Sequence, residues 1–190
     1  MRIQLLAIGD RMPRWVADGF DTYSRRLRGK IRLQLVEVPA LRRGKNADIA
    51  RLVRDEGQRL LAKVEAGAYR IALDEGGRVL TTQMMASRFS TWCEDGSNVA
   101  FFVGGADGLS NEAIASVNEI WSLSSLTLAH SLARIVFAEQ VYRAYSLMEG
   151  LPYHRGERRS LEQESPAPIE FYSQLLAGSI LSNDERRISA

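Results

Sequence analysis

The sequence predicts an α/β fold, with a mainly parallel sheet flanked by helices. Apolar segments of strand length alternate along the chain with longer segments whose apolar residues have helical spacing. The later strand segments are continuously apolar, which is typical of parallel strands that are buried on both faces. With 190 residues, of which 45% are hydrophobic, the chain is long enough for one domain with a sizeable core.

The first half of the chain contains three expected strands and two expected helices. "RIQLLAI" is a short apolar strand, and "IRLQLVEV" alternates apolar and polar or charged residues, as a strand with one buried face does. Two further segments have apolar residues at helical spacing: one lies between these two strands, and the other follows the second strand. "YRIALD" predicts a short strand that ends in a Gly-Gly turn. The expected strands cover residues 2–8, 31–38 and 69–74, and the expected helices cover 12–28 and 49–64.

The second half continues the alternation. Thr81 or Thr82 caps an expected helix that runs to about Trp92. A strand at 99–103, a short helix capped by Ser110, an extended segment at 120–128 and a long helix at 131–148 follow. After Arg155 the chain becomes polar and contains prolines. We therefore expect one domain over residues 1–155 and a loosely ordered C-terminal extension over 156–190.

Several kinds of protein are not expected from the composition. Cys93 is the only cysteine, so the chain can form neither an internal disulfide nor a thiolate metal cluster. No stretch approaches the roughly 20 apolar residues of a membrane span, and the apolar start is too short for a signal peptide. We expect a cytoplasmic protein with no membrane partner and no metal.

The charge is distributed unevenly. Residues 1–60 carry 14 Lys and Arg against 7 Asp and Glu, whereas residues 61–130 carry 4 against 8. A basic first third favours a polyanionic partner, although solvated helix faces give the same pattern. The stretches "YSRRLRGK" and "LRRGKNAD" suit contacts with a phosphate backbone. In the second stretch, Arg42, Arg43 and Lys45 are the candidate RNA-binding residues.

A glycine-rich stretch, "NVAFFVGGADGLSNEA", follows the expected strand at 99–103. It matches neither the G-x-G-x-x-G dinucleotide pattern nor a P-loop, so a bound pyrophosphate is not expected. Three strand ends are expected to meet here, because ligands of parallel sheets lie beyond the carboxyl ends of the strands. Leucines and free backbone groups suit an uncharged ring such as adenine. The candidate pocket residues are Leu73, Gly104, Gly105, Gly108, Leu123, Ser124, Ser125, Leu126, Thr127 and Leu128.

A second candidate group is cationic and lies late in the chain. His130 and Arg134 lie at the start of the last long helix, and His154 and Arg155 follow its end. Either histidine could accept a proton, and the arginines suit a phosphate or a base edge. Each histidine taken singly also fits an ordinary helix end. The four residues together form the candidate catalytic set.

Five motifs in the same order resemble the ribosomal RNA large-subunit methyltransferase H family, which belongs to the SPOUT class. The resemblance covers Met1 to about Arg155. Ala106 and Ala129 stand where some members of this family carry proline. The motifs are "RGKNADI", "GGADGLS", "WSLSSLTLAH", "EQVYRAYSL" and "PYHR".

The resemblance implies properties that the residues alone do not predict. It implies a C-terminal trefoil knot, a homodimer, and S-adenosylmethionine (S-adenosyl-L-methionine) in the candidate pocket. It implies methylation of N3 of a pseudouridine in 23S ribosomal RNA that is part of the ribosome, with Tyr153 of "PYHR" among the RNA contacts. Two alternatives remain at this point: a non-catalytic ribosome- or RNA-binding module, and a nucleotide-dependent oxidoreductase. The missing dinucleotide pattern counts against the latter.

Overall fold

The computed structural model describes residues 1–153, in which five strands alternate with five helices as predicted. The predicted extension over 156–190 lies outside the described residues and stays a prediction. In chain order the elements are β1 (Arg2–Ile8), α1 (Arg14–Ser24), β2 (Arg32–Val38), α2 (Ile49–Leu61), β3 (Tyr69–Val79), α3 (Thr82–Glu94), β4 (Val99–Val103), α4 (Asn111–Ala115), β5 (Glu119–Ser122) and α5 (His130–Met148). Within this part of the chain, no helix is both long and apolar enough to cross a membrane.

The strands form one sheet in the order β2-β1-β4-β3-β5, and every pair is parallel. Val103 at the end of β4 lies opposite Ala7 of β1 and Leu73 of β3. β1 and β4 therefore end close to one level, and β3 begins its bulge at the same level. The predicted fold class is confirmed. The predicted knot is not tested by strand order and stays a prediction.

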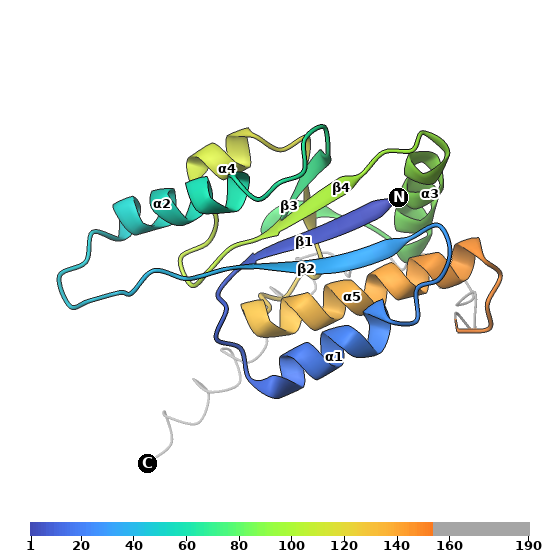
Figure 1. The fold of residues 1–190 in the computed structure, drawn as a ribbon, viewed down its shortest axis with the longest axis horizontal. Coiled ribbons are helices and arrows are strands. Elements are labelled where there is room, and N and C mark those ends of the chain that lie inside the picture. Colours follow the sequence, from blue (N-terminus) through green and yellow to red (C-terminus); the bar gives the residue numbers. More distant parts are fainter. Residues whose placement is uncertain (154–190) are drawn as a thin grey trace, which may run out of the picture. The chain divides into compact units, whose positions relative to one another are not determined.

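Helices cover both faces of the sheet (Figure 1). Leu5 and Phe101 belong to the core cluster that includes aromatic side chains of α3 and α5. Leu6 and Phe102 belong to a second cluster with Leu60 of α2. Neighbouring residues of one strand point to opposite faces, so β1 and β4 supply side chains to both clusters. This double burial explains why their sequences are continuously apolar.

Side-chain caps and tight last turns define the helix ends. Asp48, Thr81 and Ser110 each accept a hydrogen bond from the backbone N–H three residues further on, so the caps predicted at Thr81 and Ser110 are confirmed. α1 and α2 end earlier than predicted. After both helices, backbone N–H groups donate hydrogen bonds to the carbonyl oxygens three residues earlier in the chain, as in a 3₁₀ turn. The chain is therefore tighter than an α-helix at these two ends.

The third strand is longer than predicted, and the predicted Gly-Gly turn is wrong. β3 continues through Gly76 and Gly77 as a bulge, and Trp121 of β5 pairs with both Leu73 and Arg78. A Cβ on Gly77 would lie 2.5 Å from the carbonyl carbon of Trp121. Glycine is needed here because β5 passes directly over the bulge. The segment predicted to be extended over 120–128 is a strand only as far as Ser122.

A buried arginine joins α5 to the ends of two strands. Arg134 has no exposed surface. Its Nη1 lies 2.7 Å from a carboxylate oxygen of Glu37, and its Nη2 donates to the carbonyl oxygens of Ile8 and Gly9 at 3.1 and 2.7 Å. Only its Nε lacks a hydrogen-bond partner among the described residues. These bonds hold the segment after β1 and the end of β2 against the start of α5.

Replacing this arginine should destabilise the fold. Arg134→Met keeps most of the volume but leaves two buried carbonyl oxygens and Glu37 without their donor. The free energy of unfolding in urea should fall by about 3 kcal/mol, as it does when one partner of a buried pair is removed. Arg14→Met is the control, since its ion pair with Asp18 is almost fully exposed. Equal stability of the two variants would contradict this role of Arg134.

Candidate functional site

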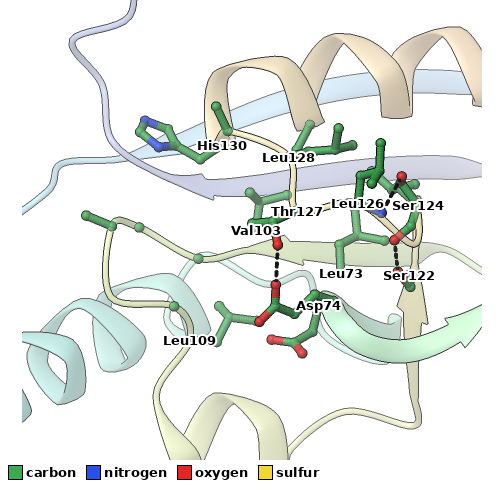
Figure 2. Close-up of a pocket in the computed structure, with 18 residues that line it drawn as sticks. Leu73, Asp74, Val103, Leu109, Ser122, Ser124, Leu126, Thr127, Leu128 and His130 are labelled. Carbon is green, nitrogen blue, oxygen red and sulfur yellow. Dashed lines mark hydrogen bonds between the residues drawn. The ribbon is translucent and has the colours of Figure 1, made fainter. Parts of the chain in front are cut away.

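A pocket of about 420 Å³ lies beside the bulge of β3 and at the carboxyl ends of β4 and β5 (Figure 2). Three segments line it: residues 73–75 of β3, a glycine loop (residues 104–108), and a hydroxyl-rich segment (residues 122–128) that leads into α5. This is where ligands bind in open parallel sheets. The three strand ends that the sequence analysis expected to meet are brought together.

The glycine loop owes its shape to its own backbone. Gly108 N donates to the carbonyl oxygen of Gly105 at 3.2 Å, and Gly108 has a φ of +80°. A Cβ on Gly104 would lie 2.5 Å from the carbonyl carbon of Gly108. Both positions therefore need glycine for the turn to close. The consequence for the pocket is a wall made of backbone, without side chains that would fill the space.

The hydroxyl-rich segment is held in shape by its own side chains. Ser122 Oγ donates to the carbonyl oxygen of Ser124 at 2.8 Å, and Ser124 Oγ accepts from Leu126 N at 2.9 Å. Thr127 Oγ1 donates to a carboxylate oxygen of Glu75 at 2.8 Å, which ties this segment to β3 (Figure 2). The three hydroxyls thus hold the segment in shape, and their residues line the pocket together with the leucines between them.

All predicted pocket residues except Ser125 line the cavity. Two carboxylates, Asp74 and Glu75, of the segment that begins at Leu73 also line it, although neither was among the candidate pocket residues. Both are exposed residues of the β3 bulge. Their signal was present as "LDEGG" at a strand end, but a turn was expected there. The other additional lining residues are Val103, Ala106, Leu109, Ser122, Ala129 and Ala133.

His130, a candidate proton acceptor, also lines the pocket. Figure 2 shows it at the end away from Ser122 and Ser124. Burial lowers the pKa of His130 below its usual value, and the nearby charge of Arg134 lowers it further. The imidazole is therefore neutral at pH 7 and has a nitrogen free of a proton.

Two of the predicted arginines have structural partners. Arg134 is fully buried and outside the pocket lining, and its charge contributes to the lowered pKa of His130, after burial. Arg43 is about three-quarters buried and forms ion pairs with Glu56 and Asp107. Those hydrogen bonds raise its pKa above the usual value. By contrast, Arg42 and Lys45, its neighbours in the basic loop (residues 41–48), are exposed.

Tyr153 lies away from this pocket. Its hydroxyl donates to Glu139 at 3.1 Å, and its ring packs on Tyr142 at 4.7 Å between centroids. Burial, followed by the bond to Glu139, raises the pKa of Tyr153 to about 12. Glu139 is nine residues beyond His130 on α5, about 13 Å along the helix axis. The other two candidate residues of this motif, His154 and Arg155, lie outside the described residues.

The pocket combines apolar side chains, a backbone wall, two carboxylates and one neutral imidazole. This donor set suits an aromatic ring with polar edges and a positively charged group. Among residues 1–153, no cluster of three or more His, Cys, Asp or Glu side chains could hold a metal ion.

Comparison with known proteins gives a consistent result. The family model described as "Predicted SPOUT methyltransferase" matches residues 1–154. Ribosomal RNA large subunit methyltransferase H of Ectopseudomonas mendocina (strain ymp) is 46% identical over 155 residues, which are 82% of this chain and 100% of that protein. The protein of the same name from Pseudomonas aeruginosa (strain UCBPP-PA14) has the same identity and coverage.

Among solved structures, TrmJ from Z. mobilis ZM4 is similar with a TM-score of 0.46 and 15% identity, over 98% of this chain and 81% of that one. The family match over residues 1–154 and the 46% identity to full-length relatives lead to one conclusion. The chain belongs to the ribosomal RNA large subunit methyltransferase H family of SPOUT methyltransferases.

Proposed function

We propose that this protein uses S-adenosylmethionine to methylate N3 of a pseudouridine in 23S ribosomal RNA, in the cytoplasm. The observation that carries the proposal is the pocket at the ends of β3, β4 and β5, within a domain that matches the methyltransferase family over its whole length. The names of the relatives supply the ribosomal RNA substrate. The modified atom comes from the family resemblance.

The residues present fit the methyl donor. Leu73, Leu123 and Leu128 supply apolar surface for an adenine ring, and the glycine loop supplies backbone groups for its polar edge. Asp74 and Glu75 place negative charge where a cationic ligand would bind. When bound, S-adenosylmethionine supplies an electrophilic methyl group on a positively charged sulfur.

The chain's own residues orient the reactants and handle one proton. Holding the target base against the pocket contributes most to the rate of methyl transfer, because alignment of the two reactants alone removes much of the activation barrier. The N3 proton passes to His130 or to His154. Arg155 stabilises the negative charge that develops on the base. Arg134 has no surface for such a contact, and its charge adds to the larger effect of burial in lowering the pKa of His130.

A homodimer is part of the proposal. Trp15 of α1 and Leu132 of α5 are about half exposed, so apolar surface is available for a second copy. The apolar faces of α5 do not by themselves require one, because the sheet, α1 and α3 already pack against it. Tyr153 is fixed far along α5, which favours action of His154 and Arg155 at the partner's pocket. Sedimentation equilibrium tests the dimer: a single species of monomer mass would contradict it.

Loss of one modification tests the reaction. In a strain that lacks the gene, mass spectrometry of 23S ribosomal RNA should show one pseudouridine without its N3 methyl group, and the purified protein should restore it. Unchanged ribosomal RNA methylation, together with retained ribosome binding, would contradict the enzyme and favour the RNA-binding module.

Filling the pocket should abolish donor binding. Thr127→Arg adds bulk and a positive charge at an exposed lining position, so the fold should tolerate it. By calorimetry, S-adenosylmethionine should bind about tenfold more weakly or worse, a loss of about 1.4 kcal/mol. Thr91→Arg, with the same charge change on the exposed side of α3, should bind normally. Normal binding by the Thr127 variant would place the donor elsewhere.

The exposed cations of the basic loop should contact RNA phosphates. Arg42→Ala combined with Lys45→Ala should weaken ribosome binding and flatten its salt dependence by about 1.5 in the log-log slope. Affinity for the donor alone should not change. Arg14→Ala with Arg59→Ala removes the same charge from exposed positions on α1 and in the last turn of α2 and is the control. An unchanged slope in the loop variant would show that these side chains do not touch RNA.

The two histidines can be separated by their effect on turnover. With both substrates saturating, replacing the proton acceptor by Gln should lower kcat by about 100-fold while donor affinity is kept. His130→Gln and His154→Gln are each compared with the wild type. If neither variant loses more than a few-fold in kcat, neither histidine takes the N3 proton.

A further inference from the structure

Arg43 connects three segments that are far apart in the sequence. Its Nη1 and Nη2 donate to the two carboxylate oxygens of Glu56 on α2 at 2.8 and 3.0 Å. Its Nε donates to Asp107 in the glycine loop at 2.8 Å, and its Nη1 also donates to the carbonyl oxygen of Leu41. One side chain thus holds the basic loop, α2 and the wall of the pocket together.

The contact with Glu56 is a fixed anchor. Glu56 is 2% exposed and also accepts the backbone N–H of Leu41 at 2.7 Å. A buried carboxylate needs these donors, because an unpaired charge is costly away from water. This cost favours retention of the contact between Arg43 and Glu56 when the contact with Asp107 is lost.

The contact with Asp107 is the separable link. Asp107 is 35% exposed and belongs to the glycine loop, between the two ends of its closing turn. Arg43 also lies close to that loop's backbone, since a Cβ on Gly105 would be 3.7 Å from Arg43 Nη2. Asp107→Asn removes the charge that joins the loops, and the pair between Arg43 and Glu56 is kept.

The two ends of this link face different ligands of the proposed reaction. Arg42 and Lys45, on either side of Arg43, are exposed and suit RNA phosphates. Gly104, Gly105 and Gly108 line the donor pocket. A ligand that holds either loop in place favours the geometry in which Arg43 reaches Asp107. The second ligand then meets a loop that is already positioned.

We propose that Arg43 is a positioning residue that couples RNA binding at the basic loop to donor binding at the glycine loop through Asp107. This inference rests on the proposed function. Coupling is reciprocal: RNA strengthens donor binding by the same factor by which the donor strengthens RNA binding. The protein thereby favours a complete pair of substrates over either one alone.

The test measures this factor in the full-length protein. The donor-side probe is S-adenosylhomocysteine, which lacks the methyl group and so cannot react. The RNA-side probe is ribosomes from a strain that lacks the gene. Equilibrium dialysis gives the Kd of S-adenosylhomocysteine with and without saturating ribosomes, and filter binding gives the reverse pair. In the wild type each Kd should fall by about fivefold or more in the presence of the other ligand.

The Asp107→Asn variant should bind each ligand on its own but lose the coupling. For either ligand, the ratio of the Kd measured without the other ligand to the Kd measured with it should approach one. Arg43→Lys, which keeps the charge but not the forked geometry, should lower the ratio as well. Asp95→Asn has the same charge change at an exposed position after α3 and should keep the wild-type ratio. A simple change in local charge would alter RNA affinity equally with and without the donor-side ligand.

The outcomes separate this inference from the proposed function. If the wild type binds neither S-adenosylhomocysteine nor ribosomes, the proposed function fails. If it binds both with a ratio of one, or if Asp107→Asn keeps the wild-type ratio, the proposed function stands and Arg43 does not couple the sites.

Discussion

The register of the central strands is the constraint on which the site depends. Ala7, Val103 and Leu73 are in line across β1, β4 and β3, so β1 and β4 end close to the level at which β3 begins its bulge. Because both faces of β1 and β4 are covered by apolar packing, a one-residue slip would turn every core side chain to the wrong face. The core therefore sets where the glycine loop and the β3 bulge emerge, and with them the position of the pocket.

Two arginines hold neighbouring segments in place at this edge of the sheet. Arg134 holds the ends of β1 and β2 against α5, and its charge adds to the larger effect of burial in lowering the pKa of His130 at the rim of the pocket. Arg43 holds the basic loop against α2 and the glycine loop. Both arginines are of a residue type that often binds anionic substrates, but here each one mainly holds neighbouring segments of the chain in position. The exposed cations next to Arg43 remain available for phosphates.

Features that depend on local pattern could be predicted from the sequence. The alternation of elements, the caps at Thr81 and Ser110, and the convergence of three strand ends follow from hydrophobic period, capping chemistry and parallel topology. The pocket lining was predictable for the same reason, since the glycine loop and the hydroxyl-rich segment directly follow strands and the remaining lining residues lie where β3 leaves its regular pairing.

Features that depend on partners far along the chain could not be predicted. Gly76 and Gly77 have the composition of a turn, and only the approach of β5 makes them a bulge. Arg43 and Arg134 look like free cations until Glu56, Asp107 and Glu37 are placed beside them. The distance between Tyr153 and the pocket likewise depends on how the chain turns back along α5.

Isothermal calorimetry of the wild-type protein tests the central claim, that the edge formed by β3, β4 and β5 is a methyl-donor site. S-adenosylmethionine should bind with one site per chain, and NAD under the same conditions should give no binding heat, because the glycine loop lacks the dinucleotide pattern. A folded protein that binds NAD, or that fails to bind S-adenosylmethionine at millimolar concentration, would contradict the account.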